Sequence, residues 1–218
     1  MKRFLLGLAG SALLALAISV SAAPISPTSY DMLNGNTGSF NYWDESYSGA
    51  GCTTCDSSPL SGGKGDLTDG VIATSNWFTA EAPAGNGPYV GWLDINPVIK
   101  FHFASGTSIN SITISVDDAD GAGGVNLPDG VVLSDGVTTF ISPLIGNLPG
   151  ADPKSFTYNN LGLFGDFVDV TFIRQDRWVF VSEVSFDGSN GTSVPEPATL
   201  LLLGSGLVAA ASRRRRRT

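Results

Sequence analysis

Four segments of this 218-residue chain alternate apolar and polar residues with a period of two. The apolar positions hold mostly β-branched or aromatic residues, which is typical of strands that are buried on one face only. In "VIKFHF", for example, Ile99, Phe101 and Phe103 share one face of the expected strand. The four segments are residues 98–103, 109–116, 167–174 and 178–186.

The last segment, "WVFVSEVSF", is expected to place its large residues on one face: Trp178, Phe180, Val184 and Phe186. Residues 138–143 and 154–158 are weaker strand candidates. Turn sequences such as "LPDG" and "LSDG" separate the strands, and few stretches have a helical period. Short strands without helical partners predict an all-β fold, an antiparallel β-sandwich or jelly roll.

The first 22 residues have the layout of a secretory signal peptide. Two basic residues precede an apolar run, and small residues follow it. Pro24 disfavours cleavage immediately before it, so we expect the cut after Ala22. The exported part would then hold one domain over residues 23–187 and a flexible linker over residues 188–194.

The chain ends on an apolar run followed by five consecutive arginines, residues 213–217. The run covers residues 198–211 and contains no charge. As a helix it would be about 21 Å long, shorter than the ~30 Å hydrocarbon core of a bilayer, so it is a marginal transmembrane segment. The arginines are expected to stay in the cytoplasm, which places the rest of the chain outside.

The motif Pro195-Glu196-Pro197, the apolar run and the arginine cluster together resemble the PEP-CTERM sorting signal of Gram-negative bacteria, here residues 195–218. The resemblance implies that an exosortase, a membrane cysteine protease, processes the tail near this motif after export by the Sec machinery. The protein would then pass from the inner membrane to the cell surface or the extracellular matrix. A permanent C-terminal membrane anchor is the alternative.

Charge is distributed unevenly along the chain. Residues 24–193 contain 19 acidic and five basic residues, so the exported part is strongly negative. Such a surface repels phosphate backbones, which argues against nucleic acid as a partner. It suits divalent cations and keeps an exported protein soluble.

The stretches "GDLTDGVIATSNW", "YVGWLDINPVIKFHF", "INSITISV" and "WVFVSEVSF" follow one another in the chain. In this order they resemble landmarks of galactose-binding-like domains, a superfamily that includes discoidin-type domains and several carbohydrate-binding modules. The resemblance spans residues 66–186 and implies a β-sandwich of a kind that binds carbohydrate. The sequence departs from the pattern in its long N-terminal stretch and over residues 121–166.

The same resemblance implies a structural calcium ion that joins the Asp-Gly loop to the closing strand. Calcium takes six to eight oxygen ligands and mixes carboxylates with carbonyls. Because Asp69 and Glu183 are far apart in the chain, a shared ion would clip the two ends of the domain together. Alternatively, Asp69 only caps a turn and Glu183 points into water. The residues that match the calcium site of the family are Asp66, Asp69, Val71, Thr74, Ser182 and Glu183.

Catalytic residues are not apparent in the sequence. His102 is the only histidine, and its place on a strand predicts an exposed sheet residue. No nucleophile-elbow motif is present, and nothing singles out two of the many carboxylates as a glycosidase pair. The run "DDADG", residues 117–121, lacks the full spacing of a calcium loop and is interpreted as an acidic turn. We therefore expect no catalytic site.

Cys52 and Cys55 are the only cysteines and lie in "GCTTC". A zinc site would need more Cys or His ligands, and a thioredoxin-type motif would begin a helix. In an exported protein, a disulfide that closes this small loop is the expected arrangement.

Aromatic residues are candidates for stacking on sugar rings. Three of the four tryptophans fall on the landmarks of the resemblance and are expected to pack in the core: Trp77, Trp92 and Trp178. Tyr42, Trp43 and Tyr47 lie in a loop-rich segment. There they form either an exposed ligand-binding platform or a packed cover.

These features predict an exported, non-enzymatic β-sandwich that binds or organises extracellular polysaccharide at the bacterial surface. Two alternatives stay open: a purely structural surface protein without a small ligand, and a glycan-cleaving enzyme whose carboxylates the sequence does not identify. Binding of a glycan separates the first function from the second, and turnover of that glycan separates the third.

Overall fold

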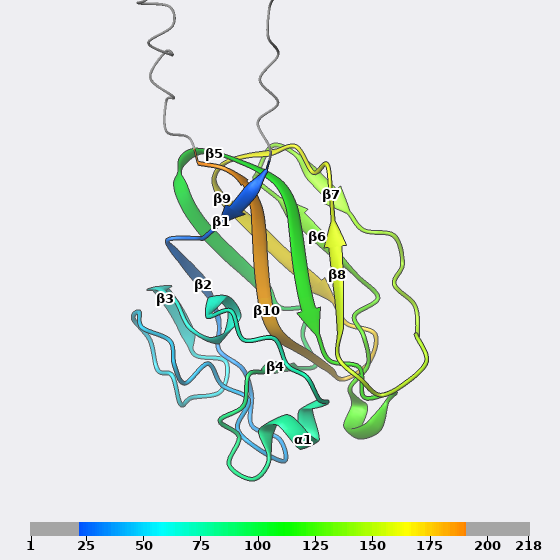
Figure 1. Cartoon of the computed structure of the whole chain (residues 1–218). Helices are drawn as coiled ribbons and strands as arrows, with labels where there is room; N and C mark the ends of the chain where they lie inside the picture. Colours follow the sequence, from blue (N-terminus) through cyan, green and yellow to red (C-terminus); the bar gives the residue numbers. More distant parts are fainter. Residues whose placement is uncertain (1–21, 191–218) are drawn as a thin grey trace, which may run out of the picture.

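The structure, a computed structural model, describes residues 22–190, which form a β-sandwich of two layers (Figure 1). Every pair of neighbouring strands in this part of the chain is antiparallel, so the expected all-β antiparallel sandwich is confirmed. In chain order the elements are β1 (Ala23–Ile25), β2 (Ser29–Leu33), β3 (Pro59–Gly63), η1 (Asp66–Thr68), α1 (Trp77–Glu81), β4 (Val90–Leu93), β5 (Val98–Val116), η2 (Ala122–Gly124), β6 (Gly130–Ser134), β7 (Thr139–Ile141), β8 (Lys154–Tyr158), β9 (Leu163–Ile173) and β10 (Trp178–Ser189).

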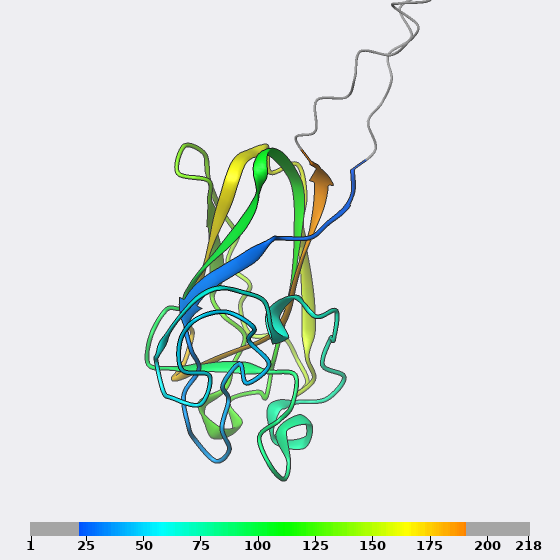
Figure 2. The ribbon, with the colours of Figure 1, turned by 90° about the vertical axis from the view of Figure 1, so that its left-hand side faces the viewer.

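The strands form two layers that pack face to face. One layer has the order β3-β2-β5-β9-β6-β7. In the other layer, β10 lies between β5 on one side and both β1 and β4 on the other, and β8 pairs with the far edge of β5. The side view in Figure 2 separates β9 of the first layer from β10 of the second.

Strand β5 belongs to both layers. Its first half pairs with β2 and β9, and its second half pairs with β10 and β8. Between His102 and Thr107 its register with β9 shifts, and Gly106 has a φ of 77°, which allows the strand to bend over the end of the sandwich (Figure 1). The two predicted strands 98–103 and 109–116 are therefore two arms of one strand.

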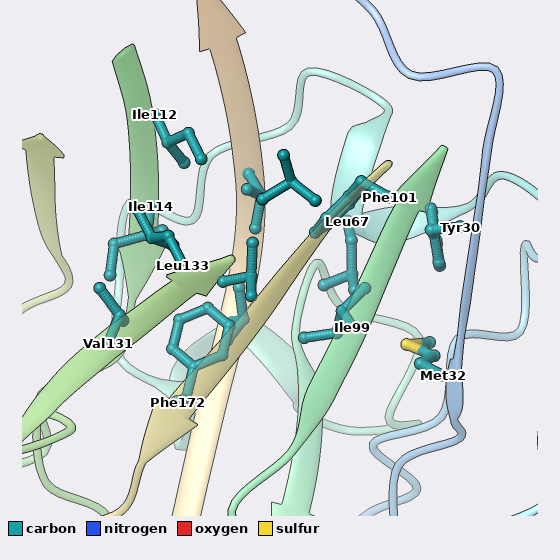
Figure 3. Packing of buried hydrophobic residues seen from close by; sticks show 14 of the residues in the cluster. Tyr30, Met32, Leu67, Ile99, Phe101, Ile112, Ile114, Val131, Leu133 and Phe172 are labelled. Carbon is teal, nitrogen blue, oxygen red and sulfur yellow. The ribbon is translucent and has the colours of Figure 1, made fainter. Parts of the chain in front are cut away.

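The main core fills the space between the layers. Ile99 and Phe101 of β5 are fully buried, as predicted from the alternation, and Phe172 of β9 packs in the same cluster. Figure 3 shows these side chains together with Leu133 from β6 and Tyr30 from β2. Each large apolar side chain buried in this way contributes about 1.5–3 kcal/mol, so the core supplies the main stabilisation of the fold.

Strand β10 departs from the predicted alternation. Between Val181 and Glu183 its register with β5 shifts, so that one extra residue forms a β-bulge. The bulge reverses the faces of the strand, and Trp178 and Phe180 lie in a second apolar cluster, on the opposite face from Val179. The prediction that these two aromatic residues share a face with the second half of the strand is therefore wrong.

Strands β1, β2, β3, β4 and β6 have no counterpart among the strands predicted from the sequence. β6 contains three consecutive apolar residues, Val131 to Leu133, so its sequence shows no alternation with a period of two. At the C-terminal end, Gly188 and Ser189 continue β10 by pairing with β5, although they were expected in the linker 188–194. A glycine and a serine carry no apolar signal, so only the pairing with β5 identifies them as part of the strand.

The loops between β2 and β3 are held together by the carboxylate of Asp44, which is fully buried. It accepts hydrogen bonds from the hydroxyl of Tyr30 and from the backbone N–H of Asp66, the latter at 3.0 Å. The hydroxyl of Ser46 donates to the same carboxylate at 3.3 Å. One buried carboxylate thus joins β2, the β2–β3 loops and η1.

The expected disulfide between Cys52 and Cys55 is present in the same loops. Asp56 follows it directly, and its carboxylate accepts a hydrogen bond from the indole N–H of Trp43 at 2.7 Å. The hydroxyl of Thr37 donates to the same oxygen of Asp56 at 2.9 Å. The small disulfide loop therefore carries the carboxylate that fixes the ring of Trp43.

Candidate functional site

Five aromatic residues gather at the end of the sandwich that carries α1 and β4 (Figure 1). We call them the aromatic cluster: Tyr42, Trp77, Tyr89, Trp178 and Phe180. Phe180 lies at its centre, with its ring centroid 4.6 Å from that of Tyr42 and 5.3 Å from that of Trp178. Edge-to-face and offset-stacked pairs at such distances stabilise one fixed arrangement of the rings.

A cavity of about 280 Å³ opens beside this cluster, and we call it the aromatic pocket. Cavities near this size accommodate small organic ligands. Four rings of the cluster form its apolar wall: Tyr42, Trp77, Trp178 and Phe180. Polar groups of three further residues also line it: Thr37, Ser39 and Arg177.

Two glycines keep the aromatic pocket open. A Cβ atom at Gly38 would lie 2.9 Å from the ring of Tyr42 and 3.0 Å from the ring of Trp178. A Cβ atom at Gly123, whose φ is 70°, would lie 2.7 Å from the ring of Trp77. Because these distances are shorter than normal carbon contacts, a larger residue at either position would displace a ring or fill the pocket.

The short helix α1 places Trp77 in the pocket. Asn76 caps the helix, because its side chain accepts a hydrogen bond from the N–H of Thr79 at 3.3 Å. The carboxylate of Asp117 accepts the N–H of Trp77 at 2.9 Å and the hydroxyl of Tyr89 at 3.2 Å. Asp117 is fully buried, although it begins the stretch 117–121 that was interpreted as an acidic turn.

A second carboxylate, that of Glu81, fixes the loop between α1 and β4. It is 1% exposed and accepts the backbone N–H groups of Gly87 at 2.8 Å and of Tyr89 at 3.0 Å. Glu81 and Asp117 thus hold both ends of α1, and with it the position of Trp77.

Burial makes the charged form of both carboxylates less favourable. It raises the pKa of Glu81 to about 7, and the nearby charge of Asp117 adds to the increase despite the two backbone hydrogen bonds. Burial likewise raises the pKa of Asp117 to about 6, against the opposing effect of the N–H of Trp77. The support of the aromatic pocket therefore contains two groups that titrate near neutral pH.

We expect the free energy of unfolding to fall between about pH 5 and pH 7.5, with about 1–2 kcal/mol of the fall due to Glu81. In this range the folded state binds more protons than the unfolded state, because burial raises the pKa of Glu81 from 4.5 to about 7. Stability present at the lower pH is therefore lost as the pH rises through the folded pKa. Urea denaturation of the wild type and of Glu81→Gln should show a smaller decrease in the variant; an identical decrease would contradict this assignment.

Arg177 supplies the charge of the aromatic pocket. Its guanidinium pairs with Asp94 at 3.2 Å, and its side chain remains 61% exposed. Arg174 approaches the same carboxylate at 3.8 Å but does not line the pocket. An aromatic wall can pack against the C–H face of a flat polar ring while hydroxyl and guanidinium groups hydrogen-bond its edge.

The three residues expected to form a ligand platform are separated by the fold. Tyr42 is 2% exposed and lies in the aromatic cluster. Tyr47 is 5% exposed, and its hydroxyl donates a hydrogen bond to the backbone carbonyl of Tyr30. Trp43 is partly exposed and lines a different cavity. The structure thus places the three side chains apart: Tyr42 lines the aromatic pocket, Tyr47 is packed inside, and Trp43 faces another cavity.

The residues expected to bind calcium do come together in space. The N–H of Gly70 donates to the carboxylate of Glu183 at 3.0 Å, and the N–H of Ala73 donates to the hydroxyl of Ser182 at 3.3 Å. The loop after η1 therefore packs on β10 at its bulge. Glu183 is 7% exposed, which contradicts the alternative that it points into water.

The rest of the expected calcium set lies in η1 and in the loop that follows it. Asp66 and Thr74 lie near its two ends, and Asp69 accepts the N–H of Val71 at 2.8 Å, as a turn cap does. Burial raises the pKa of Glu183 to about 7, and the negative charge of Asp69 adds to the increase. A cation near both carboxylates would offset this repulsion. Within residues 22–190 no group of three or more His, Cys, Asp or Glu side chains is arranged to hold a metal, so an ion here would depend on backbone carbonyls.

His102 lies on the outer face of β5. Its Nε2 atom is 2.9 Å from the carboxylate of Asp31 on β2, and its side chain is 34% exposed. It is partly exposed on the sheet, and its contact is a cross-strand pair with Asp31.

Sequence reasoning missed most of the aromatic pocket. Trp77 and Trp178 are each 8% exposed, so they pack in a cluster as expected and also line the pocket. Trp92 is fully buried in the main core, and its indole N–H donates to the carbonyl of Leu33 at 2.7 Å. The sequence analysis does not identify Arg177 as a pocket residue. The available signal is that Arg177 stands directly before Trp178 and is one of few basic residues in the exported part.

The sorting residues Pro195, Glu196 and Pro197 lie outside the described residues. So do the apolar run, the arginine cluster and residues 1–21 of the predicted signal peptide. Between residues 22 and 190, no helix has the length and apolar character needed to cross a membrane.

Residues 193–217 match the family model of the PEP-CTERM protein-sorting motif. The sorting signal predicted over residues 195–218 is therefore confirmed. No curated protein matches the chain.

Solved structures similar to this chain include "CpGH89CBM32-6 produced by Clostridium perfringens", with 19% identity, a TM-score of 0.33, and coverage of 57% of this chain and 83% of that one. The family 32 CBM from C. perfringens NanJ in complex with galactose has 10% identity and a TM-score of 0.32, and the match covers 54% and 89% of the two chains. The CBM32 of AlyQ in complex with 4,5-unsaturated mannuronic acid has 10% identity and a TM-score of 0.30, with coverage of 53% and 91%. All three are structures of carbohydrate-binding modules of family 32.

Proposed function

We propose that this protein is exported and binds extracellular polysaccharide at the bacterial surface through a sugar ring held in the aromatic pocket. The observation that carries the proposal is the pocket itself, in which four rings form one wall and hydroxyl and guanidinium groups lie beside them. A pyranose ring has the matching chemistry, because it combines an apolar C–H face with hydroxyl groups around its edge.

The position of the aromatic pocket supports a role at the surface. Strand β10 begins with Trp178, which lines the pocket. It ends at Ser189, at the other end of the sandwich, where its residues 186–188 pair with β1 (Figure 1). At about 3.3 Å per residue, its 12 residues span roughly 40 Å. A protein held at a membrane by its C-terminal tail would therefore present the pocket away from that membrane.

We propose that the binding is not coupled to catalysis. Glycosidases use two carboxyl groups about 5–10 Å apart that flank the scissile bond. Of the described residues that line the aromatic pocket, none is acidic. The buried carboxylates of Glu81 and Asp117 accept hydrogen bonds from backbone N–H groups, which supports a structural role for them.

The exported body, residues 23–193, is the natural reagent for these tests. It contains all ten described strands and both apolar clusters, and its first and last strands pair with each other. A cooperative melt of this body would verify that it is folded before binding is measured.

We expect Arg177→Ala to weaken binding of the best glycan from an array by about tenfold, because hydrogen bonds to charged groups contribute about 1.5–3 kcal/mol. Trp178→Ala should weaken it at least as much by removing a wall of the aromatic pocket. Arg174→Ala is the matched control, because Arg174 also pairs with Asp94 but lies outside the pocket. Isothermal titration calorimetry measures all three affinities.

Each outcome of this experiment separates the alternatives. Equal losses for Arg177→Ala and Arg174→Ala would show that general charge, rather than the aromatic pocket, binds the glycan. A folded body that binds no glycan would favour a purely structural surface protein. Cleavage of the bound glycan would favour the enzyme.

We further propose that an exosortase processes the sorting signal, so that the mature protein lacks the arginines at 213–217. The apolar run is a marginal transmembrane segment that follows the Pro195-Glu196-Pro197 motif, as expected for a segment held only until processing. Intact mass spectrometry of protein recovered from the producing cell should show the shortened chain. Recovery only of chains that end at Thr218 would instead indicate a permanent anchor.

We also propose a structural calcium ion between the loop after η1 and β10. The contact between Gly70 and Glu183 and the closeness of Asp69 support it. In this site Asp69 and Glu183 would supply charge, the backbone carbonyls of Asp66 and Val71 would supply two oxygen ligands, and Thr74 and Ser182 would supply further oxygens.

A further inference from the structure

We propose that a second cavity binds a positively charged amino sugar. This cavity, which we call the acidic pocket, has a volume of about 310 Å³. It lies between the β2–β3 loops, η1 and the loop that follows α1. Its lining includes Trp43, Glu45 and Asp66, and it shares no lining residue with the aromatic pocket. The proposal is therefore independent of the glycan that the aromatic pocket takes.

The ring of Trp43 is held in place before any ligand arrives. Its indole N–H donates to Asp56 at 2.7 Å, and Asp56 is itself fixed by the backbone N–H of Thr37 at 2.8 Å. The polar edge of the ring is thus satisfied within the protein, while the side chain remains partly exposed in the cavity. An aromatic face that is already fixed loses little conformational entropy when a ligand packs on it.

The charge of the acidic pocket selects a cation. Glu45 is an exposed acidic residue of its lining, and none of the described lining residues is basic. Burial and the negative charge of Asp44 raise the pKa of the second acidic residue, Asp66, to about 7, so a cation bound beside it would favour its charged form. Directly behind Asp66 lies the buried carboxylate of Asp44, which accepts the N–H of Asp66 at 3.0 Å. A negative charge beside a partly enclosed site attracts positive ligands more strongly than the same charge on an open surface does.

The opposite wall of the acidic pocket is built from backbone. A Cβ atom at Gly87 would lie 2.4 Å from a carboxylate oxygen of Glu81, so only glycine lets the chain approach so closely. Between Gly85 and Gly87, Asn86 contributes an amide that can donate and accept hydrogen bonds. This wall therefore offers polar groups suited to the hydroxyls of a ligand.

The three kinds of wall together define the ligand. A metal ion would use the carboxylates but gain no oxygen ligand from the face of Trp43. A neutral sugar would use the ring but would desolvate the carboxylate of Glu45 without giving it a partner of opposite charge. A sugar that carries a protonated amine uses the aromatic face, the carboxylates and the amide, which is the combination present in a deacetylated amino-sugar polymer.

The test compares a tetramer of glucosamine with a tetramer of N-acetylglucosamine by isothermal titration calorimetry of the exported body at about pH 6. We expect the glucosamine tetramer to bind at least about tenfold more tightly, because only its amines are charged. Spermidine, a cation without a sugar ring, should bind more weakly than the glucosamine tetramer. Equal affinity for the two tetramers, or equal affinity for spermidine, would overturn the proposal.

Variants assign the binding to the acidic pocket. Glu45→Gln should weaken the glucosamine tetramer by about fivefold, and Trp43→Ala by about tenfold. The matched control Asp166→Asn removes an exposed carboxylate from β9 and should leave the affinity unchanged. If Trp43→Ala does not fold, Trp43→Phe, which keeps a smaller ring and loses the bond to Asp56, should give a smaller but measurable loss. Unchanged affinity in Glu45→Gln and in the folded Trp43 variant would overturn the proposal.

Discussion

Asp44→Ala is expected to lower the free energy of unfolding of the exported body by about 3–5 kcal/mol. Asp44 is fully buried, and its carboxylate receives the hydroxyls of Tyr30 and Ser46 and the backbone N–H of Asp66. Alanine would remove the shared acceptor of these donors, and a buried donor without a partner costs about 1–3 kcal/mol. Denaturation in guanidinium chloride, followed by tryptophan fluorescence, measures the change.

Two further variants show whether the loss comes from the buried hydrogen bonds. Asp44→Asn keeps an acceptor oxygen and nearly the same volume, so its loss should be smaller than that of Asp44→Ala. Asp166→Ala removes an exposed carboxylate and should change the free energy by less than about 0.5 kcal/mol. A loss below about 1 kcal/mol for Asp44→Ala would mean that the β2–β3 loops do not depend on this carboxylate.

Calcium is expected to stabilise the metal-free body by about 2.7 kcal/mol when present at one hundred times its dissociation constant. For a domain of this size, that gain raises the melting temperature by roughly 5–10 °C. The physical reason is that an ion shared by Asp69 and Glu183 binds only when the loop after η1 is docked on β10. Differential scanning calorimetry with calcium and then with a chelator measures the shift.

The control for calcium is Glu183→Gln. This change removes one of two neighbouring negative charges and affects one hydrogen bond, which Glu183 accepts from the N–H of Gly70. Without metal, the free energy of unfolding should therefore fall by no more than one hydrogen bond contributes. Its melting temperature should no longer respond to calcium. A wild-type protein that contains no calcium by elemental analysis and melts at the same temperature with and without calcium would refute the site.

Much of the fold could be predicted because local patterns and the final structure agree. In the first arm of β5, Ile99 and Phe101 alternate with polar residues, and both are fully buried in the main core. Alternation with a period of two fixes which residues share a face, as long as the strand stays regular. The cysteine spacing and the sorting motif were also readable, since each depends on residues that are close together in the chain.

The candidate site was less predictable, because its two main features arise from contacts between distant segments. The buried carboxylates are an example. Asp44 and Asp117 lie in sequences typical of polar loops, and each is buried where the fold brings to it a backbone N–H group from a distant residue, Asp66 and Trp77 respectively. A polar residue can be buried when its hydrogen bonds are satisfied, and composition alone does not show whether they are.

The β-bulge in β10 is the second feature. By itself, the sequence determined the class of fold, the faces of the regular strands, the disulfide and the sorting signal. Only the tertiary structure decided that Trp178 and Phe180 turn away from the main core and line the aromatic pocket. The reason is that the extra residue between Val181 and Glu183 is defined by the pairing of β10 with β5, and one inserted residue reverses the face of every residue before it.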